Sequence, residues 1–145
     1  MATESSASTI WRGSLTEGSG TTHPESGAFP DVEVTWASRA TRSAGKTSPE
    51  ELLAAAHASC YCMALSHELS EGGNEPEQLT ATATVAFVPG EGVKSSYIVV
   101  HGRVPGIDQS QFEEAANSAG EGCPISGALK GNVEITVDAT LERSQ

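Results

Sequence analysis

The sequence predicts an α+β fold, and two observations carry that prediction. Segments with strand character and segments with helix character follow one another in the order strands, helix, two strands, helix, strand. This order is typical of an α+β protein. The longest apolar run, residues 52–65, is long enough for a buried helix but too short and too polar to cross a bilayer.

The chain has the length of one domain. It contains 145 residues with no internal repeat and no linker, so we expect a single domain over residues 1–145 with a substantial core. Residues 1–8 are small and polar, and we expect them to form a flexible N-terminus.

Five segments have the β-branched content or the alternation of strands: residues 10–15, 32–36, 79–88, 97–104 and 133–141. Residues 16–30 are rich in Gly, Ser and Thr, which predicts a turn or a short hairpin between the first two strands. Residues 39–46 are expected to form a polar connector. Residues 89–92 mark the turn that makes the third and fourth strands a pair.

The central helix is expected to begin at Pro49. Ser48 can be its N-cap, proline is favoured at the first helical position, and Glu51 would complete a capping box. Gly72 ends it. Residues 52–65 are apolar on every side, which predicts a helix at the centre of the fold rather than on its surface.

A second helix is expected after Asp108, which with Gln111 makes another capping box. Its apolar face would consist of Phe112, Ala115, Ala116 and Ala119. Glycines at 120–122 end it. A short third helix should follow Cys123, because Pro124 suits a first helical position.

Charge and composition exclude several classes of partner. The net charge is −11, with 19 acidic and 8 basic residues and no basic cluster, so we expect no nucleic-acid partner and no anionic membrane surface. No basic start followed by an apolar core is present, so we expect no secretory signal. We expect a cytoplasmic protein, in which three cysteines would be free, catalytic or metal-bound.

The cysteines are the residues most suggestive of chemistry. Cys60 and Cys62 are two apart on a helix, so they point to nearly opposite faces and cannot easily pair. A cysteine on an apolar helix is most simply a small buried side chain, and we keep that interpretation for Cys62. Cys123 is either an inert cap or a thiol that helix N–H groups hold as thiolate. One reactive thiol and a second to resolve it are the minimal equipment of a thiol peroxidase.

Cys60 lies in the middle of its helix, so a cation from elsewhere must activate it. Arg39 and Arg42 are the nearest candidates, and a carboxylate would have to hold the arginine. Glu50 is available, since Glu51 belongs to the capping box. Ten residues of helix put Glu50 roughly 15 Å from Cys60, so in a common site Glu50 would come from a second chain. We therefore expect a homodimer with shared sites; otherwise Glu50 merely opposes the helix dipole.

His57 is three residues before Cys60 and shares its face of the helix. It could act as a base, or join Cys60 and Cys123 in a metal site. The spacing is poor for metal ligands, so we expect a packed, hydrogen-bonded histidine and no metal.

Two motifs resemble a known family. Residues 47–60 with 63–65, and residues 123–126 with Leu129, are similar to the signatures of the OsmC/Ohr family, and residues 104–108 resemble its OsmC branch. The resemblance implies an α+β fold with antiparallel sheets around a long central helix. It further implies an intertwined homodimer with active sites at the subunit interface. The activity implied is thiol-dependent reduction of organic hydroperoxides and, less efficiently, of hydrogen peroxide.

The resemblance also assigns roles by position. Cys60 matches the peroxidatic cysteine, Cys123 the resolving cysteine, and Glu50 the glutamate that holds the catalytic arginine. Arg39 matches that arginine, with Arg42 as the alternative.

The implied cycle needs no organic cofactor, because sulfur carries the redox change. A dithiol, of lipoyl type by the resemblance, would reduce the disulfide, and the role would be defence against oxidative and osmotic stress. Two other functions stay open at this point: a non-catalytic, stress-associated binding protein of the same fold, and a metal-binding module. Acyl transfer or hydrolysis by Cys60 lacks a visible base with its orienting group.

Overall fold

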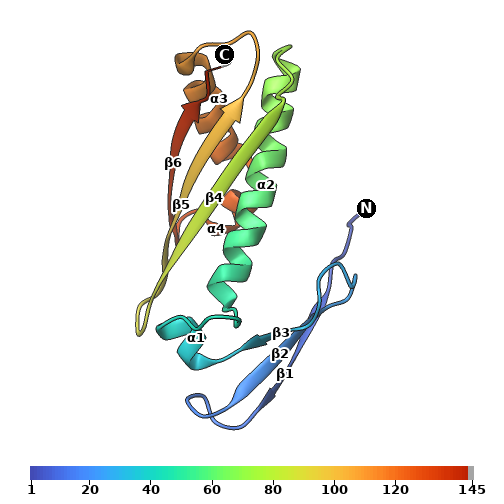
Figure 1. Ribbon diagram of the computed structural model, residues 1–145, viewed down its shortest axis with the longest axis vertical. Helices are drawn as coiled ribbons and strands as arrows, with labels where there is room; N and C mark the ends of the chain where they lie inside the picture. The colour runs from blue at the N-terminus through green and yellow to red at the C-terminus, as the bar shows by residue number, and fades with distance from the viewer. Residues whose placement is uncertain (144–145) are drawn as a thin grey trace. The chain divides into compact units, whose positions relative to one another are not determined.

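The chain forms six strands and four helices within residues 1–143, the part that this computed structural model describes. In chain order they are β1 (Ala7–Arg12), β2 (Ser19–Pro24), β3 (Val32–Val34), α1 (Trp36–Ala40), α2 (Pro49–Glu71), β4 (Gln78–Val88), β5 (Gly92–Arg103), α3 (Gln109–Gly122), α4 (Pro124–Leu129) and β6 (Glu134–Leu141). The predicted α+β class is confirmed (Figure 1). No helix in this range combines the length and hydropathy needed to cross a membrane.

Two compact units make up the chain: Met1–Leu52, and a second unit that starts at Leu53. The boundary falls in the first turns of α2, so this helix contributes residues to both units. A single domain over residues 1–145 stays a prediction.

An antiparallel sheet in the order β1-β2-β3 forms most of the first unit. Residues 16–30 are expected to hold a turn or a short hairpin, but they contain the strand β2, which pairs with both β1 and β3. β1 begins at Ala7, earlier than the expected start at Ile10, because Ala7 and Ser8 pair with Pro24 and His23 of β2. All six residues of β1 are exposed. Backbone pairing rather than burial defines this strand, so its start carries no hydrophobic signal.

The short helix α1 interrupts the alternation that predicts a strand through Trp36. Thr35 ends β3 because its side chain caps a helix. The Thr35 hydroxyl accepts from the Ser38 N–H at 3.0 Å, and Ser38 Oγ accepts from the Thr35 N–H at 2.9 Å. The buried Ser38 hydroxyl also reaches the Thr47 carbonyl at 2.7 Å. This contact ties α1 to the segment just before α2.

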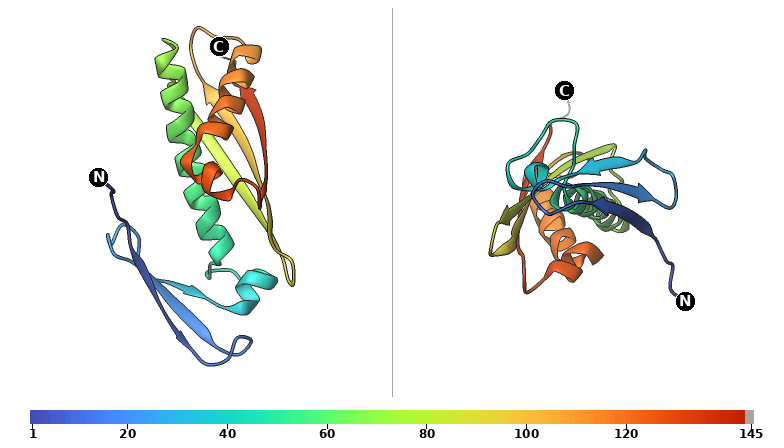
Figure 2. Two further views of the ribbon diagram at one scale, coloured as in Figure 1. Left: turned by 180° about the vertical axis from the view of Figure 1, so that it is seen from behind. Right: turned by 90° about the horizontal axis from the view of Figure 1, so that it is seen from below.

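A sheet in the order β4-β5-β6 forms one layer of the second unit. β4 and β5 are the predicted antiparallel pair. β6 runs parallel to β5, with Val137 opposite Ile98, so the expectation of purely antiparallel sheets is wrong for this pair. The crossover through α3 and α4 returns the chain to the start of the sheet, which makes a parallel strand possible. Both α2 and α3 lie against the same face of this sheet (Figures 1 and 2).

The core of the second unit is built on one stripe of α2. Its buried members are spaced by four residues: His57, Tyr61, Leu65 and Leu69. They pack against buried residues of β5 and α3, namely Ile98, Val100, Phe112, Ala116 and Ala119. Burial of each large apolar side chain contributes about 1.5–3 kcal/mol. Met63 of α2 is 74% exposed, so the described chain covers this helix on one side and not on every side.

A buried hydrogen bond fixes α3 on α2. The Tyr61 hydroxyl donates to the Ala116 carbonyl at 2.8 Å. Burial, followed by the nearby thiols of Cys62 and Cys123, raises the pKa of Tyr61. The phenol therefore stays protonated and keeps this bond at any pH at which the protein functions. The contact sets the position of the end of α3, from which Cys123 follows.

Substitution of Gly102 should show how closely α3 packs on β5. A Cβ at Gly102 would overlap the buried ring of Phe112. We expect Gly102→Ala to lower the free energy of unfolding by about 1–3 kcal/mol, measured by urea denaturation. Gly127→Ala is the control, because no atom lies within 4 Å of the added Cβ and alanine favours the helix. Equal stability of the two variants would contradict the close packing.

Candidate active site

Two cysteines that are 63 residues apart in sequence touch in the folded chain. Cys60, in the middle of α2, and Cys123, at the start of α4, have their Sγ atoms hydrogen-bonded at 2.9 Å. Cys123 is 1% exposed and Cys60 is half-buried. A disulfide of about 2.05 Å would require the sulfurs to move by only about 1 Å. The structure therefore brings together the two thiols that the sequence singles out.

Cys123 directly precedes the first turn of α4, and the groups of that turn affect its pKa. Pro124 occupies the first helical position with Cys123 as N-cap, as predicted. Burial acts to raise the pKa of Cys123, but hydrogen bonds from Cys60, from Ser126 and from the Ile125 N–H outweigh it, so the pKa of Cys123 is lowered. The sequence motif predicts where α4 begins. The influence of Ser126 on the pKa of Cys123 depends on the folded structure and is not predicted by the motif.

Cys60 has the opposite balance. Burial, and then the hydrogen bond with Cys123, raises the pKa of Cys60, and the Ile125 N–H only partly opposes the increase. The pKa of Cys123 is lowered and that of Cys60 is raised, so of the two thiols Cys123 loses its proton more readily. A thiolate on Cys60 therefore requires a cation from outside this cluster.

Cys62 stands apart from the pair. It is half-buried, and its sulfur lies near the Ala81 backbone of β4. Burial raises its pKa, with the Ala81 backbone partly opposing. The predicted separation of Cys60 and Cys62 is thus observed, and Cys62 has the environment of an unreactive thiol.

His57 is fully buried and hydrogen-bonded through both ring nitrogens. Nδ1 lies 2.6 Å from the Ser96 hydroxyl of β5, and Nε2 lies 2.8 Å from the Ser126 hydroxyl of α4. The prediction of a packed, hydrogen-bonded histidine is confirmed. Burial lowers the pKa of His57. Within residues 1–143, no group of three or more His, Cys, Asp or Glu side chains is arranged to hold a metal.

Neither serine stands out in the sequence as a functional residue. Ser126 lies inside the motif that begins at Cys123, three residues on, where a helix turn returns to the N-cap. That spacing is the one signal that could have found it. Ser96 lies in the middle of β5 with no local signal, because serine is an ordinary residue in a strand.

Arg39 and Glu50 form a close ion pair within the first unit. Arg39 Nε donates to the Glu50 carboxylate at 3.0 and 3.2 Å, and Nη2 donates to Glu50 Oε2 at 2.9 Å. The Glu50 side chain is 8% exposed and that of Arg39 is 32% exposed. This fork geometry gives the strong, oriented form of such a pair. Arg42 has a φ of 66° and makes no ion pair with any residue of 1–143.

The other glutamate at the helix start has a different contact. Ser48 Oγ accepts from the Glu51 N–H at 3.1 Å, which is half of the predicted capping box. The Glu51 carboxylate accepts from the Thr47 hydroxyl instead of reaching the Ser48 N–H. Glu51 is exposed, so the buried Glu50 is the carboxylate that orients Arg39.

α2 separates the ion pair from the thiol pair along the chain. The helix is continuous over Pro49–Glu71, and the ten residues from Glu50 to Cys60 span roughly 15 Å of its axis. The structure thus brings the four predicted site residues together as two pairs. Arg39 and Glu50 belong to the first unit, and Cys60 and Cys123 to the second.

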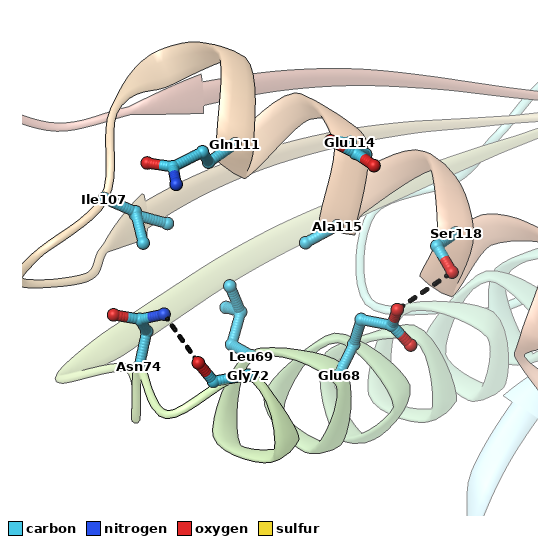
Figure 3. A pocket seen from close by; sticks show the side chains of 9 residues that line it. All are labelled: Glu68, Leu69, Gly72, Asn74, Ile107, Gln111, Glu114, Ala115 and Ser118. Carbon is cyan, nitrogen blue, oxygen red and sulfur yellow. Dashed lines mark hydrogen bonds between the residues drawn. The ribbon is translucent and has the colours of Figure 1, made fainter.

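Two pockets lie in the second unit. One, of about 250 Å³, lies between the end of α2 and α3. Figure 3 shows Leu69 pointing into it and the 3.1 Å hydrogen bond from Ser118 to Glu68 crossing it. The other, of about 410 Å³, lies among α3, α4 and β6. No cysteine lines either pocket.

Sequence comparison connects this arrangement with known proteins. The family model described as "OsmC-like protein" matches residues 42–138. Peroxiredoxin OsmC of Escherichia coli (strain K12) is 38% identical over 135 residues, which are 91% of this chain and 92% of that protein. Organic hydroperoxide resistance protein OhrB of Bacillus subtilis (strain 168) is 28% identical over 93 residues, which are 63% of this chain and 68% of that protein.

Solved structures agree with this relationship. The crystal structure of OhrB of Bacillus subtilis matches with a TM-score of 0.68 and 27% identity, covering 93% of this chain and 98% of that one. An OsmC-like protein from Mycoplasma pneumoniae matches with a TM-score of 0.70 over 99% of this chain and 100% of that one. At 17% identity that match supports the fold alone.

Of these two relatives, the OsmC protein has the higher identity and matches over nearly its whole length. This agrees with the motif at residues 104–108, which resembles the OsmC branch. The two thiols in contact are the equipment that a thiol peroxidase requires. This chain belongs to the OsmC-like family, on its OsmC branch, and is a cysteine-based peroxidase.

Proposed function

We propose that this protein reduces organic hydroperoxides, and hydrogen peroxide less efficiently, with Cys60 as peroxidatic and Cys123 as resolving cysteine. The 2.9 Å contact between the two Sγ atoms carries the proposal. A sulfenic acid on Cys60 would form next to the one thiol able to condense with it. The names of the related proteins, an OsmC peroxiredoxin and organic hydroperoxide resistance proteins, favour the substrate class.

The cycle has two chemical steps and one reduction. The Cys60 thiolate attacks the outer peroxide oxygen, the O–O bond breaks, and the alkoxide takes up a proton and leaves as an alcohol. Cys123 then attacks the sulfenic sulfur, an S–S bond forms, and the hydroxyl leaves as water with the Cys123 proton. An external dithiol reduces the disulfide by exchange, and a lipoyl-type dithiol is our proposal for that donor.

Arg39, held by Glu50, supplies the cation in this proposal. Burial raises the pKa of Cys60, so the thiolate needs a fixed positive charge beside it. A guanidinium stays charged at every relevant pH and can also hold a peroxide oxygen. The fork contact with Glu50 keeps Arg39 in one orientation.

A homodimer with shared sites reconciles the two pairs of residues. Arg39 and Glu50 of one protomer would meet Cys60 and Cys123 of its partner. Several large apolar side chains are exposed in the single chain and would be covered by a second copy: Ile10, Trp11, Leu15, Phe29 and Met63. The three free cysteines suit a reducing, cytoplasmic location, and the role would be defence against oxidative and osmotic stress.

Removal of each sulfur in turn tests the assignment. Cys60→Ser should abolish hydroperoxide reduction, because no other thiol is placed to start it. Cys123→Ser should allow one turnover and leave a sulfenic acid on Cys60, detectable by mass spectrometry after trapping with a dione reagent. Cys62→Ser is the matched control and should keep multiple turnovers. Multiple turnovers by Cys60→Ser would refute the assignment.

Loss of the charge that orients Arg39 should slow the first step. We expect Glu50→Gln to lower the second-order rate of Cys60 oxidation about 10- to 100-fold, since a hydrogen bond to a charged group contributes about 1.5–3 kcal/mol. Stopped-flow kinetics with an alkyl hydroperoxide gives the rate. Glu51→Gln, an exposed neighbour at the same helix start, should leave it unchanged. An equal loss of rate in Glu51→Gln would show that Glu50 is not the carboxylate that orients Arg39.

A mixed dimer tests whether sites are shared. A heterodimer of Cys60→Ser and Glu50→Gln protomers, purified with two different tags, would contain one intact site if each site draws on both chains. We then expect about half the wild-type activity, and sedimentation should show a dimer. If each site is confined to one chain, the heterodimer will be no more active than the mean of the two mutant homodimers.

A further inference from the structure

The two thiols in contact differ in how far a reagent can reach them. Cys123 is 1% exposed and belongs to the buried core of the second unit, together with Phe112, Ala116 and Ala119. Cys60 is half-buried and packs only against the border of that core. Both cysteines belong to the second unit. The chain therefore covers one sulfur of the pair by itself and leaves the other partly open.

Hydrogen bonds hold Cys123 in this covered position. Its backbone N–H donates to the Ala119 carbonyl at 2.9 Å. One helical turn after Cys123, the Ser126 hydroxyl lies 2.8 Å from Nε2 of His57, and both of these side chains are at most 3% exposed. That contact ties the first turn of α4 to α2, one turn before Cys60. The sulfurs need to approach by only about 1 Å to form a disulfide, so we expect the oxidised chain to keep Cys123 covered.

We propose that the dithiol that reduces the Cys60–Cys123 disulfide attacks the Cys60 sulfur, so that the mixed disulfide forms on Cys60 and Cys123 is the leaving group. The inference rests on the proposed function, which supplies the disulfide and the class of reductant. It goes further by assigning the sulfur that is attacked. A thiolate has to touch that sulfur, and the rate of exchange depends on access to it. Of the pair, Cys60 is the member with access.

The direction of approach leads to the same sulfur. In thiol–disulfide exchange the incoming, attacked and leaving sulfurs lie nearly in a line. The described residues leave Cys123 only 1% exposed, so they obstruct approach to it from every side. A second copy of the chain could add to this cover but could not remove it. Cys60 has to be reached by a peroxide in the first step of the proposed cycle, so one opening would serve the peroxide and the reductant in turn.

The atoms and electrons of the reduction balance without a further reactant. One thiolate of the dithiol forms an S–S bond with Cys60, the Cys60–Cys123 bond breaks, and Cys123 keeps the electron pair and takes up a proton. The second thiolate of the dithiol then attacks the first sulfur of the same molecule and expels Cys60 as a thiolate. The dithiol is oxidised to a disulfide, and both protein sulfurs are reduced. The last group released is thus the thiolate that attacks the next peroxide.

The site of the first adduct formed by a monothiol tests this assignment. A monothiol lacks the second sulfur that would remove it, so its mixed disulfide with the protein can be caught. Oxidised wild-type protein is mixed with excess N-acetylcysteine at neutral pH, and samples are quenched in acid, which stops exchange by protonating thiolates. Peptic peptides are then analysed by mass spectrometry. Extrapolated to zero time, we expect at least about tenfold more adduct on Cys60 than on Cys123, because access decides which sulfur is attacked.

Two controls separate burial from intrinsic reactivity. The same oxidised protein unfolded in guanidinium chloride exposes both sulfurs and should carry comparable amounts of adduct on each. A similar preference for Cys60 in the unfolded protein would show that burial does not select the sulfur and would overturn the proposal. Cys62→Ser removes the third thiol, through which an adduct could migrate, and should give the wild-type distribution. Loss of the Cys60 adduct in this variant would show transfer through Cys62 and would also overturn the proposal.

The inference and the proposed function fail in distinguishable ways. A disulfide that forms but takes up the monothiol on Cys123, or equally on both sulfurs, would overturn the inference and leave the proposed function intact. Failure of the disulfide to form in wild-type protein would contradict the assignment of Cys60 and Cys123 and would remove the inference with it. The main measurement uses unmodified protein, so it does not depend on the folding of a variant.

Discussion

The contact between the sulfurs of Cys60 and Cys123 is the constraint that the surrounding structure satisfies and on which the chemistry of the protein depends. It joins the middle of a long helix to the N-cap residue of a six-residue one. α4 is placed by the end of α3, and α3 is fixed on α2 by the Tyr61 hydrogen bond and by packing of Phe112 on β5. The packing of α3 and α4 thus brings Cys123 to within bonding distance of Cys60.

The two thiols of the site have different electrostatic surroundings. Hydrogen-bond donors at the start of α4 lower the pKa of Cys123 but leave that of Cys60 raised by burial. Under the proposed function, the positive charge for the peroxidatic thiolate comes from Arg39, which Glu50 orients, whereas groups at the start of α4 act on the resolving thiol. This division suits a two-step reaction, because the first step needs a cation near the peroxide and the second needs only a poised neighbouring thiol.

Most helices could be located from local signals because their termini are fixed by neighbouring side chains. Asp108 and Gln111 form the capping box that begins α3, and Pro124 begins α4 directly after Cys123. α1 escaped prediction because its box uses Ser38 in place of the usual Glu or Gln. The sequence predicts a start for β1 that is three residues too late, because every side chain of this strand is exposed and gives no hydrophobic signal. The parallel pairing of β6 depends on a crossover that no local pattern encodes.

The sequence by itself determined the chemical parts: two cysteine motifs, a glutamate left free at a helix start, an arginine in the segment before it, and a family likeness. Each of these is a local property of residue type and spacing. Only the tertiary structure decided which groups meet. The fork between Arg39 and Glu50, the contact of the two sulfurs, and the row from Ser96 through His57 to Ser126 join residues 11 to 69 positions apart. Such contacts arise from packing of one element on another, and single-sequence periodicity reports only which face of an element is buried.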